Sequence, residues 1–102
     1  MRPAIEIEDI EEKRRQAGID DVDLRQEIRG LRVGDVVKLT FMAGPHVFET
    51  LPVRITSMRG LAFRGTLAHK ATAAGLSTVR VGSSVVFTAA HIHSLPRKAA
   101  RL

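Results

Sequence analysis

The sequence predicts a mainly β (α+β) protein in which two short N-terminal helices precede a small antiparallel barrel of about five strands. Three observations support this fold class. The chain has 102 residues, which suits a single domain. Apolar residues recur at helical spacing before Val33 and at every second position after it. Four or five short strands also fall within about 65 residues, a density typical of a strongly bent barrel.

The first predicted helix covers residues 7–17, where Ile7, Ile10 and Ala17 share one face of an otherwise charged segment. Acidic residues crowd its start and basic residues crowd its end, an arrangement that suits the helix dipole. Gly18 then provides a left-handed stop.

The second predicted helix covers residues 21–29, with Asp20 as its N-cap and Gly30 at its end. An ion pair between Asp21 and Arg25 is expected one turn apart on its surface. Its apolar stripe, spaced at i, i+4 and i+7, consists of Leu24, Ile28 and Leu31.

Four strands are expected at residues 36–42, 51–57, 61–67 and 84–89, because apolar side chains alternate with others there. The residues expected to face the interior are Val37, Leu39, Phe41, Leu51, Val53, Ile55, Leu61, Phe63, Gly65, Leu67, Val85 and Phe87. The same alternation places three basic residues on the outer, wet face, namely Lys38, Arg54 and Arg64. A closing turn or short strand is expected at "HIHSLP", residues 91–96.

The pairing of the second and third strands depends on the turn between them. A three-residue loop at 58–60, with its left-handed residue at Gly60, keeps both apolar faces inward, whereas a two-residue turn at 59–60 mixes them. The longer loop is therefore expected. It gives the cross-strand pairs Ile55–Phe63 and Arg54–Arg64.

Charge divides the chain into an acidic helical leader (residues 1–32), a barrel (33–95) and a basic tail (96–102). Residues 1–30 hold nine acids and six bases, a net charge of −3, whereas residues 31–102 hold ten bases and two acids, a net charge of +8. We therefore expect the leader to fold onto the basic body, or its helices to exchange with a second copy and form a homodimer.

The composition excludes several classes of protein. The chain has no cysteine, so disulfides and thiolate sites are excluded. Its N-terminus lacks the apolar stretch of a secretory signal, and no run approaches the ~18 apolar residues of a membrane span. These features predict a small basic cytoplasmic protein that does not associate with membranes.

Several pieces of the sequence resemble one family. They are "VGDVVKL" at residues 33–39, Glu49, "VRITSMRGLAFRGTL" at 53–67 and "VGSSVVFTAAHI" at 81–92. Together they resemble a family of small SH3-like barrels known only as a domain of unknown function, number twenty-three fourteen. The resemblance covers about 60 residues and implies an SH3-like barrel, but no defined activity.

The candidate site is the basic trio Lys38, Arg54 and Arg64. Arginines placed directly opposite each other repel, and a bridging anion relieves that repulsion. Three interpretations stay open: a merely solvated face, a site for an acidic partner or for the leader, and a nucleic-acid surface that binds phosphates. The last is weakened because only Phe48, in a loop, is expected to be free for base stacking.

Other chemistry is weakly represented. His91 and His93 form an H-x-H pair, but too few further ligands stand near them for zinc. No nucleophile elbow or phosphate-cradling glycine loop is present. The sequence therefore predicts a binding or interaction module without catalytic residues, metal or cofactor.

Overall fold

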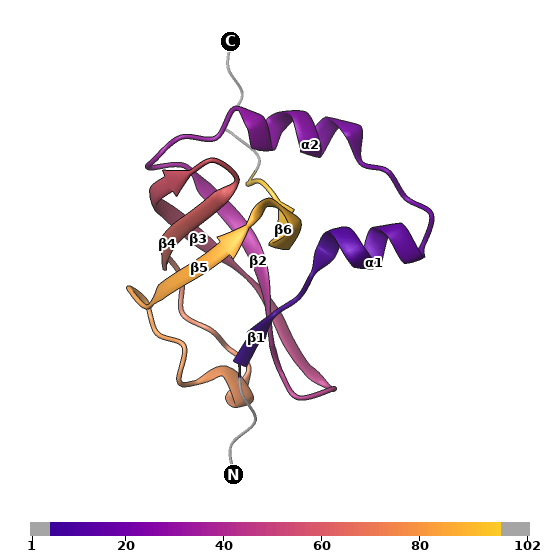
Figure 1. The fold of residues 1–102 in the computed structure, drawn as a ribbon. Helices are drawn as coiled ribbons and strands as arrows, with labels where there is room; N and C mark the ends of the chain where they lie inside the picture. The colour runs from indigo at the N-terminus through magenta and orange to yellow at the C-terminus, as the bar shows by residue number, and fades with distance from the viewer. Residues whose placement is uncertain (1–4, 97–102) are drawn as a thin grey trace.

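A computed structural model of the chain describes residues 5–96, and six strands in it form one antiparallel sheet. The strands are β1 (Ile5–Ile7), β2 (Val36–Ala43), β3 (Val47–Arg59), β4 (Ala62–Leu67), β5 (Ser84–Thr88) and β6 (Ile92–Ser94). The helices are α1 (Ile10–Gln16) and α2 (Val22–Arg29), with the 3₁₀ turns η1 (Ala74–Leu76) and η2 (Ala89–His91). The strand order is β1-β2-β3-β4-β5, with β6 also on β2, and the sheet curls into a nearly closed barrel (Figure 1). The mainly β class is confirmed.

The two helices follow the first strand rather than preceding the whole sheet, which corrects the predicted order of elements. Ile5 and Ile7 are half-buried and alternate with exposed Glu6, and β1 pairs with the end of β2. Ile7 therefore belongs to a strand and not to the first helix. That helix begins at Ile10, because the Asp9 side chain accepts the Glu12 N–H and caps it.

The second helix also differs at its start. Asp21, not Asp20, is the N-cap, since its Oδ1 accepts the Leu24 N–H at 3.0 Å. Asp20 instead forms the ion pair with Arg25 that was expected of Asp21. The predicted apolar stripe is confirmed, because Leu24, Ile28 and Leu31 are all buried.

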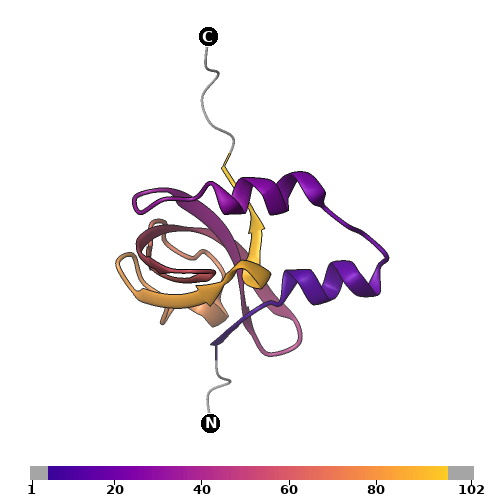
Figure 2. The ribbon, with the colours of Figure 1, turned by 45° about the horizontal axis from the view of Figure 1, so that its top comes forward.

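Both helices lie on the same side of the barrel, beside η2 and β6 (Figure 2). Gly18 ends the first helix with φ of +72°, as predicted, and the chain then crosses to α2 through residues 19–21. One barrel side thus carries a helical layer, whereas no helix within residues 5–96 covers the outer faces of β3, β4 and β5.

The interior consists of aliphatic side chains and three phenylalanines, and nearly all of the predicted inward positions are buried. Phe63 and Phe87 stack with ring centroids 5.3 Å apart. Leu61 is the exception, because it lies in the β3–β4 turn and is 61% exposed.

The turn between β3 and β4 is shorter than predicted. Arg59 pairs with Ala62, so the turn holds only Gly60 and Leu61, and Gly60 has φ of +59°. Glycine as the first central residue is typical of a two-residue hairpin turn. A bulge between Ile55 and Ser57 absorbs the extra residue. The bulge resets the alternation, so both apolar faces still point inward.

Gly65 shows how closely β3 and β4 approach. A Cβ atom at this position would lie 2.6 Å from the Arg54 carbonyl oxygen and 2.6 Å from Val53 Cγ1. Only glycine fits there, which explains its place among larger inward-facing residues.

Candidate functional site

The basic trio lies on the outer face of three adjacent strands. Lys38 pairs with Pro52 across β2 and β3, while Arg54 pairs with Val36 on β2 and with Thr66 on β4. The predicted direct pairing of Arg54 with Arg64 is therefore wrong, because the bulge shifts Arg64 opposite Ser57.

The three basic residues instead occupy diagonal positions along one line across β2, β3 and β4. Diagonal neighbours in a sheet lie about 7–8 Å apart, close enough for one extended anionic partner to reach both members of a pair. Arg54 and Arg64 are exposed and Lys38 is half-buried. The Arg54 guanidinium donates to the Gly34 carbonyl at 2.9 Å, which holds the side chain along the sheet.

The two acids of the barrel are both occupied by backbone N–H groups. Asp35 Oδ2 accepts the Arg32 N–H at 2.9 Å and closes the turn before β2. Glu49 reaches from β3 to the loop before η1 and accepts the N–H groups of Thr72 and Ala73 and the Thr72 hydroxyl. Neither carboxylate neutralises a basic side chain of the barrel.

Glu49 is the barrel acid whose pKa is shifted. The Ala73 N–H lowers the pKa of its carboxyl below the ordinary value, and the Thr72 donors and the charge of His69 lower it further, against a smaller rise from burial. The carboxylate stays charged well into the acid range and holds the loop. That Glu49 holds this loop was not predicted from the sequence. The available signal is a charged residue at an inward-facing strand position, opposite Phe41.

Within residues 5–96, every side-chain ion pair joins two residues of the leader. The pairs are Lys13–Glu8, Arg15–Glu11, Arg15–Glu12 and Arg25–Asp20. The seven bases of residues 31–96 form no ion pair within the described chain, and they face only two acids. Barrel charge is thus left uncompensated, at a net +5 for those residues.

From residue 5 onward, the leader contacts the barrel without ionic pairing. The Glu8 N–H donates to the Thr40 carbonyl at 2.9 Å, and the Arg14 guanidinium donates to the His93 carbonyl at 2.8 Å. Buried Ile10 and the α2 stripe add apolar contact. The leader therefore folds onto the body, but through backbone pairing and apolar burial rather than through attraction of opposite charges.

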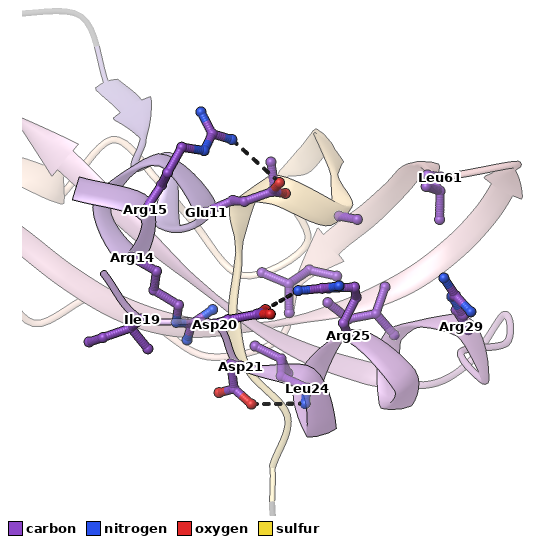
Figure 3. Close-up of a pocket in the computed structure, with 14 residues that line it drawn as sticks. Glu11, Arg14, Arg15, Ile19, Asp20, Asp21, Leu24, Arg25, Arg29 and Leu61 are labelled. Atoms are coloured by element: carbon purple, nitrogen blue, oxygen red, sulfur yellow. Dashed lines mark hydrogen bonds and ion pairs between the residues drawn. The ribbon is translucent and has the colours of Figure 1, made fainter. Parts of the chain in front are cut away.

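A cleft of about 450 Å³ lies between the helices and the barrel, and no pattern in the sequence predicts it. Figure 3 shows Arg14 and Ile19 beside it, Leu24, Arg25 and Arg29 from α2, and Leu61 from the β3–β4 turn. Its floor is apolar, and its rim carries four arginines and three acids. Because Arg15 and Arg25 already pair with Glu11 and Asp20, the cleft is nearly neutral.

The histidine pair is split between two environments. His91 Nδ1 accepts the Thr88 N–H at 2.9 Å, which makes this residue a cap of η2, and His93 Nδ1 lies 2.9 Å from the Ser94 hydroxyl. Among residues 5–96, no group of three or more metal-ligating side chains comes together. Phe48 lies within β3 rather than in a loop, and its ring is 68% exposed.

Comparisons of the chain with protein-family models, curated proteins and solved structures find no match. The resemblance to SH3-like barrels thus rests on the sequence pieces alone. Among the described helices, the longest has eight residues, and none has the length and apolar character needed to cross a membrane.

Proposed function

We propose that this protein is a non-catalytic interaction module, built on an SH3-like barrel, that binds an acidic protein partner through the outer face of β2, β3 and β4. The residues that contact the partner are Lys38, Arg54 and Arg64. The observation that carries the proposal is the uncompensated charge of the barrel, since none of the seven bases of residues 31–96 pairs with a carboxylate of the described chain.

The partner is a second molecule rather than the leader of the same chain. Six of the nine leader acids are already engaged, because Glu8, Glu11, Glu12 and Asp20 pair with leader bases and Asp9 and Asp21 cap helices. The helices also lie on the barrel side next to β6 and η2. In the described part of the chain, the outer face of β3 and β4 therefore stays open to an external anion.

A nucleic acid is the second candidate, and one observation favours it. The exposed Phe48 ring stands on the same strand as Arg54, six residues away, so that both side chains point outward. Proteins that bind single-stranded nucleic acid place aromatic rings beside basic groups, so that the bases stack on the rings and the phosphates contact the basic groups. The acidic protein is preferred because only one aromatic ring is available, and base stacking normally uses several.

The test compares two anions on the same protein. Full-length wild type and the variants Arg54→Glu and Arg64→Glu are titrated by fluorescence anisotropy with a labelled oligoglutamate and with a labelled single-stranded RNA at several salt concentrations. We expect the glutamate probe to bind wild type and each reversal to weaken it about tenfold, because attraction becomes repulsion. Arg59→Glu, at the last residue of β3 and beyond the basic trio, is the matched control and changes affinity less.

Two results contradict the proposal. Absence of glutamate binding even at low salt rejects an acidic partner at this face. Tighter binding of RNA than of the glutamate probe, with a steep salt slope and further loss in Phe48→Ala, favours the nucleic-acid alternative.

A further inference from the structure

The free edge of β5 is the least protected strand edge of the barrel. β5 pairs with β4 on one side, and within residues 5–96 no strand pairs with its other side. Its sequence, Ser-Val-Val-Phe-Thr, has no charge and no proline, and its register with β4 runs without a bulge. Charged residues, prolines and bulges usually protect an edge strand against the addition of another strand, and β5 has none of the three.

The register shows which backbone groups face this free edge. The Leu67 N–H donates to the Ser83 carbonyl and the Ala89 N–H donates to the Leu61 carbonyl, so the bonded pairs fall at every second residue between them. Val85 and Phe87 therefore direct their backbone groups toward β4. The backbone groups of Ser84, Val86 and Thr88 point away from β4. Since the Thr88 N–H already donates to His91 Nδ1, Ser84 and Val86 supply the donors of the open edge.

The surroundings of the edge favour an acidic occupant. Arg64 pairs with Val86 across β4 and β5, and the Val86 side chain is 64% exposed on the outer face. A strand added beyond β5 lies about 10 Å from β4, because strands are spaced by ~4.8 Å. An arginine and a glutamate side chain together span that separation.

The chain contains an example of such an occupant. In β1 the isoleucines at positions 5 and 7 turn toward the core and Glu6 turns to solvent, and this segment adds antiparallel to the edge of β2. A segment alternating apolar and acidic residues is thus one that this barrel accepts at an edge. A second copy is a poorer occupant, because two barrels of net positive charge repel and β1 is already paired with β2.

We propose that β5 is a docking edge that binds an extended partner segment of alternating apolar and acidic residues as an additional antiparallel strand. This inference rests on the proposed function, since it specifies how the acidic partner is held. Main-chain hydrogen bonds to Val86 supply the register, and acidic side chains reach Arg64.

The experiment uses the full-length protein and a synthetic octapeptide of alternating valine and glutamate. The control peptide has the same sequence with alternate backbone nitrogens methylated. It keeps every charge but lacks the backbone N–H donors at the methylated positions. We expect the methylated peptide to bind about tenfold more weakly, the loss of one to two backbone hydrogen bonds. Saturating parent peptide slows exchange of the Val86 amide at least tenfold by NMR.

Protein variants give an independent readout. Val86→Pro removes the outward N–H and fits an edge position, and it is expected to weaken the parent peptide about tenfold. Val86→Thr keeps the N–H and a β-branched side chain, so it binds within about twofold of wild type. If Val86→Pro does not fold, the comparison of the two peptides decides.

The outcomes separate this inference from the proposed function. Equal binding of both peptides, with an unprotected Val86 amide but weakened binding in Arg64→Glu, rejects the docking edge and leaves the basic face standing. Absence of any acidic binding rejects both. Protection of Val86 without peptide, together with a mass above the monomer by light scattering, identifies a second copy as the occupant and overturns the acidic partner segment.

Discussion

The leader (residues 1–32, described from residue 5) and the barrel (33–95) distribute charge and burial in opposite ways. The leader holds all four side-chain ion pairs of the described chain and buries few side chains, with Ile10 the only buried residue of α1. The barrel buries a continuous core and leaves its bases unpaired. The difference indicates that the leader is held by a few apolar contacts, whereas the barrel maintains its shape while keeping charge available for a partner.

The largest expected effect lies in the barrel core. Phe87 is 1% exposed and stacks on Phe63, so Phe87→Ala removes a full aromatic ring and leaves a cavity. We expect the free energy of unfolding to fall by about 3–5 kcal/mol, measured by urea denaturation. Phe48→Ala is the matched control, because its ring is 68% exposed, and it changes stability by less than about 0.5 kcal/mol. Similar losses in both variants would show that the core does not lie where the alternation places it.

The second expected effect compares apolar and ionic contacts within the leader. Leu24 is buried on α2, and Leu24→Ala is expected to cost about 2–3 kcal/mol. Arg25→Ala removes the exposed pair with Asp20 and is expected to cost less than about 1 kcal/mol, falling further in high salt. Thermal unfolding of both variants at low and high salt measures the contrast. A larger, salt-sensitive loss in Arg25→Ala would mean that charge, not burial, holds the leader.

Much of the barrel could be predicted because side-chain alternation carries the information. Val37, Leu39, Phe63 and Phe87 were all expected inside and are buried. The error at the β3–β4 turn arose because a bulge and a shorter turn preserve the same inward faces as a longer loop. Alternation alone does not distinguish a three-residue loop from a two-residue turn with a bulge. The prediction therefore assigned Leu61 to the interior, whereas the turn leaves it exposed.

The leader and the site were harder to predict for physical reasons. Three residues of β1 are too few to establish a period, and the acidic residues after them also suit a helix start. The candidate trio was placed on the correct face, but its spacing depends on the bulge. The β5 edge and the cleft depend on which segments are neighbours in space, and such neighbours are invisible to a one-dimensional pattern.

The smallest effect on global unfolding is expected at Glu49, because it holds one loop of the barrel. Its carboxylate accepts the N–H groups of Thr72 and Ala73, while Leu76 anchors the same loop by burial. Since folding lowers the pKa of Glu49, its contribution is complete above the unfolded-state pKa of about 4.3 and is lost as pH falls through the lower folded-state pKa.

The amide chemical shifts of Thr72 and Ala73, followed by NMR from pH 7 downward, measure this loss. Wild type should show constant shifts to about pH 5 and a step in the acid range, because protonation removes the charged acceptor. Glu49→Gln should lack the step and keep the loop loosened at every pH, while the amides of β4 stay unchanged. A step that persists in Glu49→Gln would assign the acid transition to another carboxylate. The loop would then be held by the burial of Leu76, and Asp35 would be the one barrel acid whose hydrogen bond to the backbone matters for structure.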